Sequence, residues 1–119
     1  MNKVERIVQV EIKKVYDLLK GGLGINHIYT QRQAMHESFL TVMDDETASI
    51  LEYSIYLVFQ SMDTEYYDYH TICKTSAKIF KDSMRKNASP KEVAKNTIKE
   101  ELEIFTNLTH EFKRSTTNG

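Results

Sequence analysis

The sequence predicts an all-α protein, a single-domain antiparallel helix bundle of four to five helices. Three observations favour this class: apolar residues recur at helical spacing along the chain, no segment alternates like a half-buried strand, and the sole proline stands at a helix start. The 119 residues are 40% hydrophobic and 28% charged, which suits one domain with one core. We expect the bundle to span residues 1–112 and residues 113–119 to form a polar, frayed tail.

A central helix is predicted over residues 46–62. A helix that is apolar over most of its circumference has to be covered by neighbours on several sides, so this segment should organise the bundle. Its buried stripe is expected to contain Ala48, Leu51, Ser54, Ile55, Val58, Phe59 and Met62, with Ile50, Tyr53 and Leu57 adding apolar surface on the flank.

Two helices are predicted before the central one. The first covers residues 3–20 and ends at Gly21 and Gly22, because glycine accepts the left-handed conformation that closes a helix. The second starts at Thr30 in a capping box or, alternatively, at Asn26, and ends before residue 44. The apolar residues expected to face the core are Val4, Ile7, Val8, Ile12, Val15 and Leu19 in the first helix, and Ala34, Met35, Phe39, Val42 and Met43 in the second.

Two further helices are predicted after the central one. The fourth runs from Glu65 to about Lys86 with Asp63 or Thr64 as its cap, and the fifth begins at Ser89, where Pro90 takes the first helical position. The expected buried stripes are Tyr69, Ile72, Cys73, Ser76, Ala77, Phe80 and Met84 in the fourth helix, and Val93, Thr97, Ile98, Leu102, Phe105, Leu108 and Phe112 in the fifth.

Charge is segregated along the chain although the net charge is only −1. Residues 37–73 hold eight Asp or Glu and no Lys or Arg, whereas residues 74–99 hold eight Lys or Arg against two acids. An acidic block followed by a basic block can fold back on itself or pair with a second copy of the chain, so we expect a homodimer as one possible state.

The remaining composition indicates a cytoplasmic protein without a metal or cofactor. No apolar run reaches the length of a membrane span, the amino-terminal residues carry charges throughout, and Cys73 is a single cysteine. No Glu is followed three residues later by His, and His36-Glu37 lacks the second His of a zinc-binding helix.

A tyrosine-rich acidic segment provides the candidate for partner binding. Three tyrosines in four positions cannot all face one core, so at least one of Tyr66 and Tyr67 should be on the surface. Exposed tyrosine is a preferred anchor for protein partners, whereas rings that only cover a helix corner are the structural alternative. We expect a non-enzymatic cytosolic protein that regulates or inhibits a larger partner through Asp63, Glu65, Tyr66, Tyr67 and Asp68.

Two other function classes remain open. A helix-turn-helix over residues 12–40 would present His27, Gln31 and Arg32 to DNA, although the slightly acidic chain lacks the usual basic footprint. The spacing of Arg32 and His36 on one helix face resembles the Arg…His pair of HEPN-type ribonucleases, which implies a helical nuclease, but it is shorter than the family's spacing. A possible basic surface that could contact phosphate, or be merely solvated, comprises Lys74, Lys78, Lys81 and Arg85.

Overall fold

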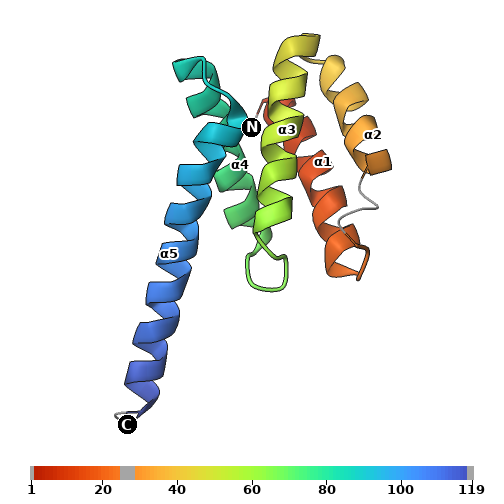
Figure 1. Cartoon of the computed structure of the whole chain (residues 1–119). Coiled ribbons are helices and arrows are strands. Elements are labelled where there is room, and N and C mark those ends of the chain that lie inside the picture. The colour runs from red at the N-terminus through yellow and green to blue at the C-terminus, as the bar shows by residue number, and fades with distance from the viewer. Residues whose placement is uncertain (1, 25–28, 118–119) are drawn as a thin grey trace.

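The computed structural model describes residues 2–24 and 29–117, with side chains described for residues 2–24 and 30–108. The predicted all-α bundle is confirmed, and no strand occurs in these residues. The helices in chain order are α1 (Lys3–Lys20), α2 (Tyr29–Leu40), α3 (Asp45–Ser61), α4 (Tyr69–Lys86) and α5 (Pro90–Thr117) (Figure 1).

Helix α3 lies at the centre of the bundle. It packs against α2, α4 and α5, while α1 packs against α2 and α4. Figure 1 shows α4 and α5 on one side of α3, and α1 and α2 on the other. The predicted central stripe is confirmed, since all seven of its residues from Ala48 to Met62 are buried.

Helix ends follow the local signals in most cases. Asn2 and Asp44 cap α1 and α3 by accepting the backbone N–H of Glu5 and Thr47. At the other end of α1, Gly22 has φ 102°, and the backbone N–H of Leu23 donates to the carbonyl of Leu18 at 3.0 Å. This closed turn is the glycine stop that the sequence predicts.

The predicted start of α2 near Thr30 is met to within one residue, whereas the predicted start of α4 at Glu65 is wrong by four residues. Helix α2 begins at Tyr29, so Thr30 lies inside the first turn, and the alternative start at Asn26 falls outside the described residues. Helix α4 begins at Tyr69, because Asp68 rather than Asp63 or Thr64 caps it by accepting from the N–H of Thr71. Asp63, Thr64 and Asp68 can each cap a helix, and the structure uses Asp68, the last of the three along the chain.

The predicted core faces of four helices need correction. Ile79, Thr75 and Ser83 are buried in α4, whereas Met84 is 46% exposed, so the buried stripe is centred on Ile72, Ser76 and Ile79. Thr75 and Ser83 are accommodated because their hydroxyls donate to the carbonyls of Thr71 and Ile79 within the same helix. Exposed exceptions in other helices are Val4 in α1, Ala34 in α2, and Leu102, Phe105 and Leu108 in α5.

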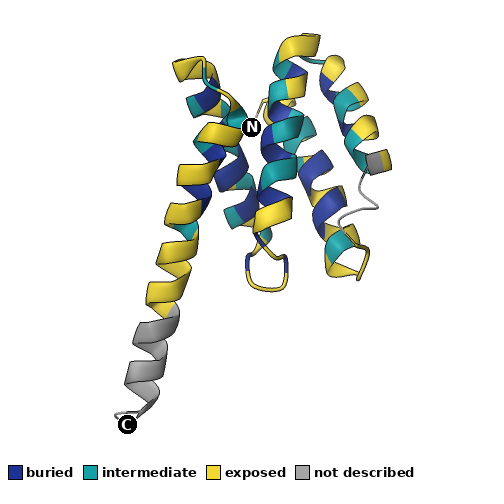
Figure 2. Ribbon diagram, in the orientation of Figure 1, coloured by how far each residue is buried: buried dark blue, intermediate teal, exposed yellow. Residues whose placement is uncertain are grey.

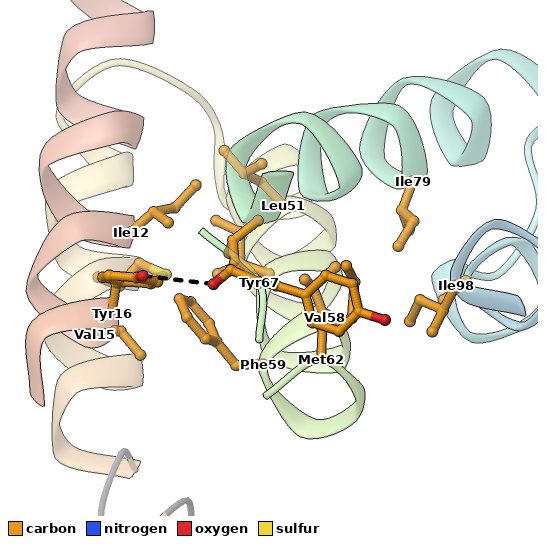
Figure 3. Packing of buried hydrophobic residues seen from close by; sticks show 14 of the residues in the cluster. Ile12, Val15, Tyr16, Leu51, Val58, Phe59, Met62, Tyr67, Ile79 and Ile98 are labelled. Carbon is orange, nitrogen blue, oxygen red and sulfur yellow. Dashed lines mark hydrogen bonds between the residues drawn. The ribbon is translucent and has the colours of Figure 1, made fainter. Parts of the chain in front are cut away.

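Tyr67, in the turn after α3, packs among α1, α3 and α5. Its ring lies across the end of α3, between Tyr16 of α1 and Ile98 of α5 (Figure 3). The Tyr16 hydroxyl donates to the Tyr67 backbone carbonyl at 3.4 Å, whereas the Tyr67 hydroxyl is buried with no hydrogen-bond partner in the described part of the chain. The turn after α3 is therefore part of the core.

The first turns of α5 pack against the bundle, where Ala94, Thr97 and Ile98 are buried. From residue 99 to residue 108, where the description of side chains ends, every side chain except that of Glu101 is exposed (Figure 2). The radius of gyration is 15.6 Å, whereas a compact domain of this length has about 13.5 Å. The helix also passes the predicted end at residue 112 and continues to Thr117. The predicted fraying of the last residues stays a prediction.

The unpartnered hydroxyl of Tyr67 leads to a test of the core. Because Tyr67→Phe removes a buried polar group without breaking a hydrogen bond, it should leave the free energy of unfolding unchanged or raise it by up to about 1 kcal/mol. The matched variant Tyr16→Phe removes a donor and should lower it by about 0.5 kcal/mol. Urea unfolding followed by circular dichroism measures both, and a clear loss of stability in Tyr67→Phe would contradict the assignment.

Candidate functional site

The turn between α3 and α4 is held in one conformation by Asp63. Its carboxylate accepts from the backbone N–H of Glu65 at 2.8 Å, and its carbonyl accepts from the N–H groups of Tyr66 and Tyr67, both at 3.0 Å. The Asp68 carboxylate accepts hydrogen bonds from Thr71 at the start of α4, and the bond from the Thr71 backbone N–H contributes most. These bonds hold the pKa of Asp68 below its usual value. The turn therefore presents its side chains from a fixed backbone.

The two candidate tyrosines of this turn have opposite environments. Tyr66 is 62% exposed, whereas Tyr67 is 8% exposed and belongs to the core, where burial raises the pKa of its phenol. The expectation that at least one of them lies on the surface is confirmed. Tyr67 does not present its ring to a partner. We call the exposed residues of the turn, Asp63, Glu65, Tyr66 and Asp68, the turn surface.

The distal half of α5 extends this surface with apolar side chains. Leu102, Phe105 and Leu108, which we call the α5 stripe, are 41%, 38% and 60% exposed. They lie on the same face of α5 as the buried residues Ala94 and Ile98. The other helices do not extend far enough along α5 to cover them (Figure 2). The Phe105 ring lies 6.0 Å from that of Tyr66 and 5.2 Å from that of Tyr67. The turn surface and the α5 stripe are thus contiguous.

A shallow groove lies beside the α5 stripe, between α3 and α5. Leu57 of α3 and Ala94, Ile98 and Leu102 of α5 form its apolar lining. Along one rim it carries three exposed lysines at spacings of four residues, Lys91, Lys95 and Lys99. We call this feature the α3–α5 groove. Sequence patterns alone did not indicate it, because it depends on how the two helices diverge.

A second polar cluster links α2 to α3. Arg32 Nε lies 2.7 Å from one oxygen of Glu52, and His36 Nδ1 lies 2.6 Å from the other. The opposite ring nitrogen of His36 lies 2.9 Å from Asp45. The Arg32 guanidinium also lies 4.5 Å from the centre of the Tyr56 ring. The spacing of Arg32 and His36 signalled a shared face, but nothing in the sequence identified Glu52 as their common partner.

The positive and negative charges of this Arg32–His36 cluster balance. The two carboxylates of Glu52 and Asp45 offset the charge of Arg32 and of a protonated His36, so little positive charge is left for a phosphate. Arg32 is held against α3 with its side chain 26% exposed, rather than projecting toward a groove of DNA. The position of Arg32 and His36 therefore gives no support to the nuclease and helix-turn-helix alternatives, and His27 lies outside the described residues.

The other singled-out residues lie at separate places. Lys74, Lys78, Lys81 and Arg85 are all exposed on α4, where Lys78 pairs with Glu100 at 3.5 Å and Arg85 with Asp82 at 3.3 Å. Cys73 is half-buried and packs against the core. Burial raises the pKa of its thiol, which keeps the sulfur protonated and disfavours a nucleophilic role.

The fold and its surfaces define a small helical bundle with an uncovered apolar face. Comparisons with protein-family models, with curated proteins and with solved structures found no match to this chain. In the described ranges 2–24 and 29–117, no helix is long and apolar enough to cross a membrane. Within the same residues, no group of three or more His, Cys, Asp or Glu side chains is arranged to hold a metal ion.

The position of His36 between two carboxylates predicts a pH dependence of stability. The hydrogen bond to Asp45, followed by the bond and charge of Glu52, raises the pKa of His36 above 6.5 against the opposing effect of burial. Because the folded pKa lies above the unfolded one, this stabilisation is complete below the unfolded pKa and is lost as pH rises through the folded pKa. His36→Gln should therefore lower Tm more at about pH 5.5 than at about pH 8.5.

Thermal melts of wild type and variant at the two pH values measure this difference. The control is His70→Gln, since His70 is exposed and makes no carboxylate hydrogen bond among the described residues. An equal loss of Tm at both pH values in His36→Gln would contradict the proposed role of the protonated imidazole.

Proposed function

We propose that this chain is a non-enzymatic protein that acts by binding another protein, as a regulator or inhibitor of a larger partner. The observation that carries the proposal is the contiguous exposed apolar surface from Tyr66 to Leu108. Isolated exposed apolar side chains are ordinary, but a contiguous exposed apolar group is typical of an interaction site. Aromatic side chains also contribute most to binding when a partner covers them.

Tyr66 is the anchor in this proposal. Its backbone is held by Asp63 and its ring leans on Phe105, so little conformational freedom would be lost on binding. The ring is 62% exposed and can still lose much of its surface to a partner. A preorganised aromatic side chain of this kind suits a protein pocket better than a flexible one does.

The charges around Tyr66 indicate the chemistry of the partner. Asp63, Glu65 and Asp68 are exposed on the same turn, and Asp63 and Asp68 are fixed further by their hydrogen bonds to backbone N–H groups. An acidic rim around an apolar anchor complements a pocket with basic residues at its edge. A cytoplasmic setting fits the single, half-buried free cysteine.

A crosslinking experiment can find the partner. Benzoylphenylalanine placed at position 66 in cells that naturally produce the chain should give, on illumination, one discrete adduct with a heavier protein. The same probe at Lys81, on the exposed side of α4, serves as the control and should not give this adduct. Mass spectrometry of the adduct identifies the partner.

The identified partner then allows a quantitative test. Tyr66→Ala should weaken its binding by about tenfold or more, since truncating an interface anchor typically costs about 2 kcal/mol. Lys81→Ala should bind as wild type does. Calorimetric titration measures both constants, and circular dichroism checks that the fold is intact. Equal affinity of the two variants for the partner would contradict the role of Tyr66.

A further inference from the structure

The order of charges along α5 favours an antiparallel neighbour. Residues 91–99 carry Lys91, Lys95 and Lys99 against one acid, and the next turn carries Glu100, Glu101 and Glu103. In a parallel pair of such helices like charges face each other, whereas in an antiparallel pair the basic part of each helix faces the acidic part of the other. The helix therefore complements a reversed copy of itself.

The α3–α5 groove and the α5 stripe also favour an antiparallel pair. The α3–α5 groove offers half-buried Leu57 and exposed Leu102 above the buried Ala94 and Ile98, with a rim of lysines. The α5 stripe, which shares Leu102 with the groove, offers apolar side chains beside glutamates. When α5 of a second copy runs in the opposite direction, its stripe lies over this groove, and by symmetry the second groove receives the first stripe. One contact therefore covers the α5 stripe and the exposed part of the groove.

We infer that the occupant of the α5 stripe is a second copy of this chain, which pairs antiparallel along α5 and inserts Leu108 into the α3–α5 groove of its partner. The inference rests on the proposed function, because it assigns a second copy of the chain to the α5 part of the proposed binding surface. The turn surface with Tyr66 stays at the margin of this contact, where it can serve the larger partner.

The molar mass of the full chain in solution tests this inference. Sedimentation equilibrium at micromolar concentration should give twice the 13.9 kDa of one chain. Leu108→Asp should weaken self-association by about tenfold or more, because it places a charge in an apolar groove. The matched control is Met84→Asp, since Met84 is 46% exposed on α4 away from the groove, and it should remain dimeric. A monomeric wild type, or a Leu108→Asp variant as dimeric as wild type, overturns the inference.

Charge exchange tests the antiparallel direction. The variant Lys95→Glu/Lys99→Glu and the variant Glu103→Lys should each be monomeric, because like charges then face each other at both symmetric contacts. Glu100 is left unchanged, because it pairs with Lys78 of the same chain. An equimolar mixture should restore a dimer that contains one chain of each. Failure of the mixture to associate, or dimers of either variant alone as tight as wild type, would rule out this pairing.

The two proposals fail in different ways. A monomeric wild type that still captures its partner through Tyr66 overturns the dimer and leaves the proposed function standing. A dimer that follows the charge exchange, together with Tyr66→Ala that binds the partner as wild type does, supports the dimer and overturns the role of Tyr66.

Discussion

The need to cover α3 on several sides constrains most of this structure. Its buried residues face three other helices, and the helices before and after it occupy opposite sides (Figure 1). Ser54 fits among these apolar residues because its hydroxyl donates to the Ile50 carbonyl of the same helix at 2.7 Å. The turn that follows contributes Tyr67 to the same core, so the bundle and the turn are stabilised together. The rigidity of the turn surface follows from this shared packing.

The helices themselves could be predicted from the sequence, because their signals are local. The Gly21–Gly22 stop and the Ser89–Pro90 start each need only a few neighbouring residues. The start of α4 was harder, since Asp63, Thr64 and Asp68 can all cap a helix. In the structure Asp63 accepts from Glu65 within the turn, Tyr67 is buried in the core, and Asp68 caps α4. Buried Thr75 and Ser83 escaped prediction for a related reason, because hydroxyls that bond to their own helix do not register as apolar.

The candidate surfaces could be predicted only in part. The tyrosine count required an exposed ring, and Tyr66 meets this requirement. The exposure of Leu108 was missed because periodicity identifies a helix face without telling whether any element covers it. The junction of Arg32 and His36 on Glu52 joins residues of two helices, and such pairings depend on how the helices pack rather than on spacing within either one.

The division of α5 into a packed and an uncovered half affects how the helix forms. Starting a helix is unfavourable, whereas lengthening an existing one costs little, so the packed turns near Ile98 act as a nucleus for the turns that follow. The turns from residue 99 to residue 108 bury no side chain of their own and depend on this propagation. Warming should therefore loosen these turns while the bundle is still intact, so that the position of the α5 stripe varies with temperature until another molecule covers it.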